Sequence, residues 1–236
     1  MLLPGDPQRA LAVAQLLLDR PKMFNHARGL WGYTGVASDG EPLTVQSTGM
    51  GGPSAAIVCE ELVALGARRL VRIGTCAGLS PDLELGALLA AQRVLPRDGA
   101  SAALGADGAV APDGLLTGRL VEAGARPATV LSSDLFYDAR RWEGEVGDAG
   151  GWEGETRTAS GPFAAGIESA APGPLAVDLE SAAVLVVAER REVRAACVLA
   201  VTSLASGLES LRAQPEALEP VGARLGEAGY AALRTR

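Results

Sequence analysis

One arginine stands in a run of apolar residues that otherwise has the composition of a buried strand. It is Arg72, in Leu-Val-Arg-Ile-Gly-Thr at residues 70–75. A guanidinium buried without a partner is costly, so Arg72 must meet an anion. One candidate is a structural ion pair with Glu60 or Glu61 on the preceding predicted helix. The other is a ligand phosphate at the carboxyl end of the strand, where ligands bind in open α/β sheets and where Thr75 offers a hydroxyl.

Two glycine-rich loops add to the case for phosphate. Residues 4–9, Pro-Gly-Asp-Pro-Gln-Arg, place the amide of Gly5 just before a predicted helix, with Arg9 in its first turn. Amides and the positive dipole end at such a helix start bind anions. Residues 49–54, Gly-Met-Gly-Gly-Pro-Ser, lead into a second helix in the same way. Glycines before helices are common and usually structural, so it is the combination with Arg72 that favours a phosphate site.

Further polar residues precede a long apolar helix. They are Asp178, Glu180 and Ser181. Asp178 and Ser181 are explained as residues of a helix start, and Glu180 as a charge that favours the helix dipole. Because the helix after it is apolar on all sides, the Glu180 carboxylate is also expected at the edge of the core. A carboxylate there is suited to binding two vicinal hydroxyls, such as those of a ribose.

Charge and hydropathy exclude several classes of partner. The 236-residue chain has a formal net charge of −7, which disfavours nucleic acid because binding to its phosphate backbone needs a basic face. No apolar run approaches the roughly 18–20 residues of a membrane span, and residues 1–7 do not resemble a signal peptide. We therefore expect a cytoplasmic protein with no membrane or nucleic-acid partner.

Histidine and cysteine usage limits metal and nucleophile chemistry. His26 is the single histidine, so a histidine-rich zinc site cannot form, and no serine-nucleophile motif accompanies it for a catalytic triad. No metal site is expected. Cys59, Cys76 and Cys197 are odd in number and lie among apolar residues, which predicts reduced thiols in the core.

The alternation of apolar and amphipathic segments predicts an α/β fold. Strands are expected at residues 30–36, 43–47, 70–74, 87–94, 129–132 and 195–202. Helices are expected at residues 7–19, 53–66, 179–192 and 215–233, with another around Val121. Asp6 and Pro7 should begin the first helix as its N-cap and first residue. Residues 138–175 match no element pattern, and no internal repeat is visible.

Six motifs, in order along the chain, resemble those of the oligomeric nucleoside phosphorylases, a family that includes bacterial purine nucleoside phosphorylase and uridine phosphorylase. They are residues 3–9, 25–35, 47–54, 72–78, 133–137 and 177–182. The resemblance implies a single domain over residues 1–236, with a mixed central β-sheet flanked by helices. It also implies phosphorolysis of a nucleoside, most readily a purine nucleoside, to free base and ribose 1-phosphate. Phosphate would be a co-substrate, and no cofactor is expected.

The same resemblance implies which residues form the site. Those expected to bind phosphate are Gly5, Arg9, Arg72 and Thr75, together with Arg28, which would reach the phosphate of a neighbouring subunit in a dimer-based homo-oligomer, commonly a hexamer. Those expected at the ribose are Met50, Asp178, Leu179 and Glu180. Those expected at the base are Cys76, Ala77, Gly78, Phe136, Val177 and Ser203. Arg72 and Ser203 would carry the catalytic roles.

Some positions depart from the family pattern. Asp178 and Leu179 replace the first two residues of a usual Glu-Met-Glu, which leaves the ribose carboxylate in place. Purine-specific members have Asp or Asn where this chain has Ser203. Uridine-specific members carry a Gln/Arg pair in the segment after residues 136–137. Arg140 and Arg141 lie nearby in this chain, but no glutamine accompanies them. The family's N-terminal histidine is absent, which leaves a truncated or misplaced start open.

Three other functions remain open at this point. Uridine phosphorylase is the alternative within the family. A nucleosidase-type hydrolase, which uses water, is disfavoured because such enzymes lack the phosphate arginines that stand here as Arg9, Arg28 and Arg72. A non-catalytic nucleoside-binding homologue is made credible by Ser203 and by the divergent residues 138–175.

Overall fold

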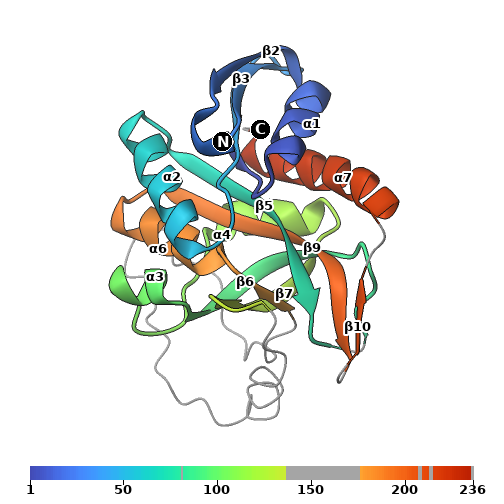
Figure 1. Cartoon of the computed structure of the whole chain (residues 1–236). Coiled ribbons are helices and arrows are strands. Elements are labelled where there is room, and N and C mark those ends of the chain that lie inside the picture. The colour runs from blue at the N-terminus through green and yellow to red at the C-terminus, as the bar shows by residue number, and fades with distance from the viewer. Residues whose placement is uncertain (81, 137–175, 207–208, 213–214, 235–236) are drawn as a thin grey trace.

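The computed structural model of the chain describes residues 1–80, 82–136, 176–206, 209–212 and 215–234 (Figure 1). Its strands are β1 (Leu2–Leu3), β2 (Leu18–Asn25), β3 (Gly32–Ala37), β4 (Pro42–Gln46), β5 (Arg69–Gly78), β6 (Leu88–Arg97), β7 (Arg126–Ser133), β8 (Ala176–Asp178), β9 (Arg194–Ser206) and β10 (Glu209–Arg212). Its helices are α1 (Pro7–Leu17), the 3-10 helix η1 (Ala27–Gly29), α2 (Gly52–Ala64), α3 (Gly99–Ala103), α4 (Gly114–Glu122), α6 (Ser181–Arg190) and α7 (Pro215–Leu233).

The strands form one mixed sheet in the order β10-β9-β6-β7-β8-β5-β1-β4-β3-β2. Strand β9 also pairs with β5, so that β5, β9, β6, β7 and β8 close on themselves. Strands β4, β1, β5 and β9 run parallel to their neighbours in that group, and therefore their carboxyl ends lie at the same edge. The α/β class expected from the sequence, with a mixed sheet flanked by helices, is confirmed.

Two groups of helices cover the sheet (Figure 1). One core cluster joins buried residues of α1, α4 and α7 to the sheet, and includes Val13 and Leu225. The other joins α2 and α6 to the sheet, and includes Leu62 and Val184. Burial of these apolar side chains, at about 25 cal/mol per Å² removed from water, is the main force that holds the helices on the sheet.

The cysteines lie in this interior as the sequence predicts. All three are free thiols and buried. Burial raises the pKa of Cys59 to about 12 and that of Cys197 to about 12. These thiols are therefore protonated and inert near neutral pH. No helix in the described part of the chain is long and apolar enough to cross a bilayer.

The first helix begins as predicted but ends earlier. Asp6 caps it by accepting a hydrogen bond from the backbone amide of Arg9 at 2.7 Å. The helix stops at Leu17 because β2 starts at the next residue. The sequence did not predict β2, since its exposed residues Asp19 and Lys22 break any apolar alternation. Charges on an outermost strand are a usual protection against pairing with another chain.

Several elements after α2 begin or end at other residues than expected. Strand β5 continues to Gly78, and α6 begins at Ser181 rather than at residue 179. The reason is β8, a strand of three residues that pairs with both β5 and β7. The helix predicted around Val121 is present as α4. Residues 138–175, for which no element was predicted, lie outside the described residues.

Candidate active site

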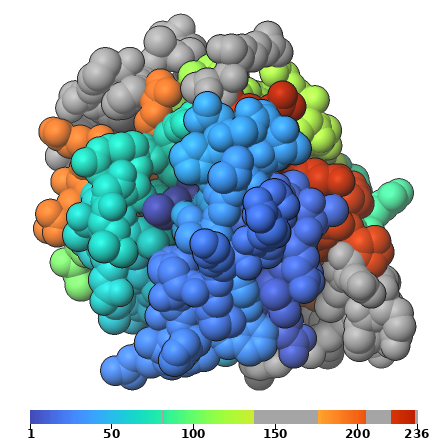
Figure 2. All heavy atoms as spheres, turned by 90° about the horizontal axis from the view of Figure 1, so that it is seen from above, coloured from blue at the N-terminus to red at the C-terminus, as the bar shows by residue number. Residues whose placement is uncertain are grey.

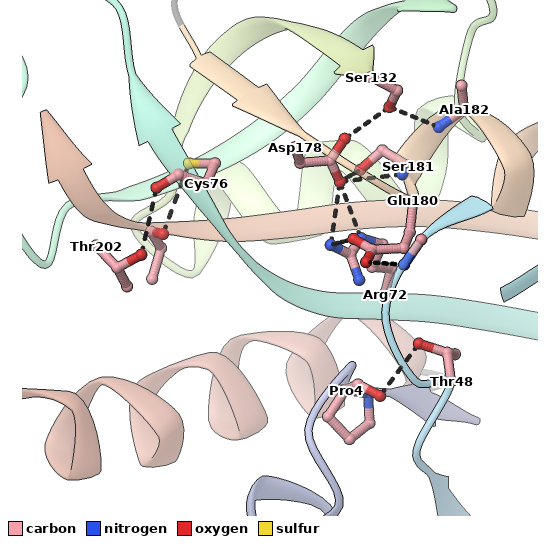
Figure 3. A network of polar contacts seen from close by, with 12 residues as sticks. Pro4, Thr48, Arg72, Cys76, Ser132, Asp178, Glu180, Ser181, Ala182 and Thr202 are labelled. Atoms are coloured by element: carbon pink, nitrogen blue, oxygen red, sulfur yellow. Dashed lines mark hydrogen bonds and ion pairs between the residues drawn. The ribbon is translucent and has the colours of Figure 1, made fainter. Parts of the chain in front are cut away.

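Arg72 is buried, with 2% of its surface exposed, and it pairs with two carboxylates, one on the last residue of β8 and one two residues beyond it (Figure 3). Its Nε donates to Oδ2 of Asp178 at 3.1 Å, and its Nη2 donates to Oε2 of Glu180 at 2.5 Å. The predicted alternative of a pair with Glu60 or Glu61 is wrong, because Glu60 instead accepts from Arg191 at 2.6 Å.

Electrostatics keep this guanidinium charged. Burial opposes its charge, but the Glu180 and Asp178 carboxylates outweigh that effect and raise the pKa of Arg72. Its Nη1 is also buried, and it has no hydrogen-bond partner among the described residues. Two of the three guanidinium nitrogens are thus committed to fixed carboxylates, and the third remains as a donor for an anion.

Gly74 makes room for the guanidinium on strand β5. A Cβ at this position would lie 2.6 Å from both Cζ and Nη2 of Arg72. Such a contact is far inside van der Waals distance, so only glycine permits the arginine to fold back over its own strand. The group that approaches the backbone at Gly74 is therefore the Arg72 guanidinium.

Asp178 lies behind Arg72 rather than at the surface of the site. Its Oδ1 accepts from the Ser132 hydroxyl at 2.6 Å, and its Oδ2 accepts from the amide and hydroxyl of Ser181 at 3.0 and 2.6 Å (Figure 3). The Asp178 side chain has no exposed surface. The prediction that Asp178 contacts a ribose therefore does not fit its position, and the structure gives it contacts that orient Arg72 instead.

Glu180 connects Arg72 to the second glycine-rich loop. Its Oε1 accepts from the amide of Gly51 at 2.7 Å, while its Oε2 accepts from Arg72. Gly49 and Gly51 both have positive φ, at +73° and +89°, which explains the glycines of this loop. Met50 lies between them and is 81% exposed. The structure thus brings Glu180 and the Met50 loop together, as the ribose prediction requires, with Leu179 next to Glu180 in sequence.

The first glycine-rich loop lies beside the second. The carbonyl of Pro4 accepts from the amide of Thr48 at 2.8 Å, and the carbonyl of Gly5 accepts from the hydroxyl of Ser47 at 2.9 Å. A Cβ at Gly5 would lie 3.2 Å from the carbonyl oxygen of Gly49. Both loops follow parallel strands, β1 and β4, so the sheet itself places them side by side.

Arg9 brings a second guanidinium into this region. Burial lowers the pKa of Arg9; the Asp6 carboxylate raises it, and the charge of Arg72 lowers it. The Nε of Arg9 lies near Gly222 of α7, 4.0 Å from where a Cβ would stand. Two partly or fully buried guanidinium groups that repel one another favour an anion in their vicinity. Thr75 follows on strand β5, half-buried, at the carboxyl edge to which both loops belong.

The residues predicted to contact a base gather only in part. Ala77 and Val177 belong to one small apolar cluster, and Phe136 packs against it. Ser203 is buried and lies opposite Ala77 in the β5–β9 pairing. Apolar walls with one hydroxyl suit a flat heterocycle.

Cys76 and Gly78 differ in their surroundings. The Cys76 thiol points into the main core, with Sγ 3.6 Å from the carbonyl oxygen of Ala200, and burial raises its pKa. Only backbone of Cys76 is left for the site, and its carbonyl accepts from Thr202 at 3.5 Å. A Cβ at Gly78 would lie 2.9 Å from Leu204 Cδ2, so this glycine allows close strand packing.

Arg28 does not join the other predicted phosphate residues. It is exposed in η1, between β2 and β3, whereas Arg72 is on β5, and β1, β4 and β3 separate β5 from β2 in the sheet. In the described part of the chain it forms no ion pair or side-chain hydrogen bond with a neighbour. Its placement is compatible with an action outside its own subunit.

Sequence reasoning missed Ser132, which orients Asp178 and also accepts from the amide of Ala182 at 3.0 Å. Its signal was a pair of serines at the end of an apolar strand, the position where ligand-binding residues occur in such sheets. Among the described residues, no group of three or more His, Cys, Asp or Glu side chains is placed to hold a metal ion.

Comparison with known proteins gives several partial matches. A protein of Oceanobacillus iheyensis, "Purine nucleoside phosphorylase DeoD-type", is 43% identical over 93 residues, which are 39% of this chain and 39% of that protein. The protein of the same name from Caldanaerobacter subterraneus is 46% identical over 86 residues, 36% of this chain and 37% of the relative. The one from Geobacillus kaustophilus is 34% identical over 153 residues, 61% of this chain and 64% of the relative. The chain thus matches less than two thirds of the length of each.

A family-level match is far more extensive than these pairwise ones. The profile of the Phosphorylase superfamily matches residues 1–233. That range contains both glycine-rich loops, the Arg72 strand and the segment with Asp178 and Glu180. With a match over nearly its whole length, and with those segments assembled at one edge of a mixed sheet, the chain belongs to the Phosphorylase superfamily.

Proposed function

We propose that this protein is a nucleoside phosphorylase that converts a purine nucleoside and inorganic phosphate to free base and ribose 1-phosphate. The observation that carries the proposal is the environment of Arg72. This buried, charged guanidinium keeps one donor nitrogen for which the described residues supply no partner, and it contacts Glu180, the carboxylate beside the Met50 loop. An arginine that can donate a hydrogen bond to phosphate is here in direct contact with a carboxylate suited to binding ribose. This arrangement matches a reaction that joins phosphate to ribose.

In the proposed reaction the bond from C1′ to the base nitrogen breaks, and an oxygen of phosphate forms the new bond to C1′. The electron pair of the broken bond leaves with the base, which takes up a proton or accepts a hydrogen bond. Arg72, Arg9 and a partner subunit's arginine at position 28 would hold the phosphate dianion against the positive charge that develops on the ribose. Orientation and electrostatic stabilisation would then account for most of the rate.

The base preference follows from Ser203. Its hydroxyl can support a base that leaves with little proton transfer, whereas protonation of a 6-aminopurine at N7 calls for a carboxylic acid. We therefore expect 6-oxopurine nucleosides to be favoured over adenosine. Ser203→Asp should raise activity on adenosine relative to inosine. A clear preference of the unmodified protein for uridine would contradict this choice and make uridine phosphorylase the better description.

We further propose a dimer-based homo-oligomer, with a hexamer as the expected form, in which each Arg28 serves the phosphate site of the neighbouring subunit. Its support is the exposed position of Arg28 at the far edge of the sheet from Arg72. A cytoplasmic location is proposed as well, because the buried free thiols suit a reducing compartment.

One assay separates the candidate functions. Inosine, guanosine, adenosine and uridine are each incubated with the protein, with and without inorganic phosphate, and free base and ribose 1-phosphate are measured. Phosphate-dependent release of both products supports the proposal. Release of base without phosphate would indicate a hydrolase, and binding of nucleoside without release would indicate a non-catalytic homologue.

A further inference from the structure

The loop that carries Arg28 has an unusual backbone. Arg28 has φ +56° and Gly29 has φ +73°, so two consecutive residues are left-handed. For a residue with a Cβ this conformation is unfavourable, and it persists only where the surrounding structure enforces it. Because Arg28 is exposed, packing of its own side chain is not what enforces the conformation. Figure 2 shows the N-terminal segments, in blue, forming the outer part of one face beside α2.

The side-chain amides of Asn25 and Gln46 hold the loop in this left-handed conformation. Asn25 donates through Nδ2 to the carbonyl of Leu30 at 2.7 Å and accepts through Oδ1 from the amide of Ala27 at 3.1 Å. Gln46 donates through Nε2 to the same Leu30 carbonyl at 3.1 Å and to the carbonyl of Ser47 at 2.7 Å. The two amides also meet, with Asn25 Nδ2 3.4 Å from Gln46 Oε1. The Asn25 amide thus holds both ends of the loop, at Ala27 and Leu30, and the Gln46 amide holds the Asn25 side chain in place.

Gly32 leaves room for the Gln46 side chain. A Cβ there would lie 2.0 Å from Gln46 Oε1 and 2.8 Å from the Phe24 ring. Gln46 itself is buried, with 2% of its surface exposed. Burying an amide is costly unless its hydrogen bonds are satisfied, so a buried glutamine fully engaged under an exposed loop is a specific arrangement.

We propose that Asn25 and Gln46 are positioning residues for Arg28, which hold its loop so that the guanidinium reaches the phosphate in a neighbouring subunit. This inference rests on the proposed function, in which Arg28 completes that site. The chain's own first glycine-rich loop is attached to the same strand end, because Ser47, the residue after Gln46, donates to the carbonyl of Gly5 at 2.9 Å. Asn25 and Gln46 therefore fix the position of Arg28 relative to the first glycine-rich loop of the same chain.

The kinetic test compares Asn25→Ala and Gln46→Met with Arg28→Ala, alone and combined. Asn25→Ala and Gln46→Met should each raise KM for phosphate about fivefold and leave KM for the nucleoside nearly unchanged. In the Arg28→Ala background the same changes should have no further effect on KM for phosphate, since the group they position is gone. Thr34→Ala is the matched control, because it removes the 3.1 Å Thr34–Thr44 hydrogen bond from the same hairpin without touching the amide pair.

A second measurement reads the loop itself. Hydrogen exchange of a peptide covering residues 26–31 should be faster in Asn25→Ala and Gln46→Met, and unchanged in Thr34→Ala. Unchanged exchange in both amide variants, or effects on KM for phosphate that add fully to those of Arg28→Ala, would overturn the proposal. If the wild-type protein shows no phosphorolysis, the proposed function fails. The exchange rates then decide on their own whether the amide pair holds the loop.

Discussion

At the scale of single residues, the site depends on how one guanidinium divides its donors. Arg72 gives Nε to Asp178 and Nη2 to Glu180, and its buried Nη1 has no partner among the described residues. A planar group with fixed donor directions can serve three acceptors in this way. An ammonium group carries the same charge without the fixed geometry.

Arg72→Lys should therefore lower kcat/KM for phosphorolysis by about 10²-fold or more, mainly through phosphate, while most of the stability remains. The retained charge still faces the two carboxylates. Arg72→Ala would leave the two buried carboxylates without a counter-charge and destabilise the protein by about 3–5 kcal/mol. Steady-state kinetics with varied phosphate and thermal unfolding check both expectations. Arg69→Lys, on the same strand, is the control, and a near-normal kcat/KM in Arg72→Lys would refute the phosphate role.

Glu180→Gln tests the ribose role. We expect kcat/KM to fall more for a ribonucleoside than for its 2′,3′-dideoxy analogue, because only the former presents hydroxyls to the carboxylate. The variant also weakens the contact to Arg72, which affects both substrates alike, so the ratio between them is the informative quantity. Equal losses on the two substrates would show that Glu180 does not touch the ribose.

The sequence identified most of these residues but not their contacts. Arg72 was recognisable because a charge in an apolar strand demands an anion. Its partners were not, because Asp178 and Glu180 are 106 and 108 residues away, whereas the expected Glu60 lies nearby in the chain. Periodicity reports the face on which a side chain lies, and it does not report which distant segment packs there.

At the scale of elements, long strands and helices were predictable and short or exposed ones were not. Strand β5 and helix α2 have strong apolar patterns. Strand β8 has three residues, too few for a pattern, and β2 is exposed along most of its length. Strand β8 nevertheless delivers Asp178 to the site, and β2 leads to the loop that carries Arg28.

Strand β5 offers a test of geometry without any change of charge. Gly74→Ala places a Cβ 2.6 Å from the Arg72 guanidinium and 2.9 Å from Leu199 Cδ2. We expect a loss of about 1–3 kcal/mol of stability, and a marked rise in KM for phosphate. Gly118→Ala in α4, where a Cβ meets no atom within 4 Å, is the matched control and should be neutral or slightly stabilising. A Gly74→Ala protein with normal KM for phosphate would show that the pose of Arg72 is not required.

At the scale of the whole molecule, the proposed sharing of Arg28 predicts complementation between defective subunits. At a phosphate concentration far below the raised KM values of the variants, Arg28→Ala and Arg72→Lys chains should each show little activity. When they are mixed under conditions that exchange subunits, some two-fold dimers would collect both defects in one site and leave the other intact. Phosphate-dependent base release should then return in part. No recovery despite exchange verified by mass spectrometry would mean that Arg28 acts within its own chain or not at all.

The contacts of the site also span the chain. Arg72 meets Asp178 across 106 residues, and Gly51 meets Glu180 across 129. Contacts so distant in sequence close large loops and form only when most of the chain is already folded. A ligand that binds there recognises the finished fold alone, and at a hundred times its Kd it would add about 2.7 kcal/mol to the stability. Substrate would then slow unfolding and proteolysis of the protein, so that its lifetime would rise with the supply of substrate.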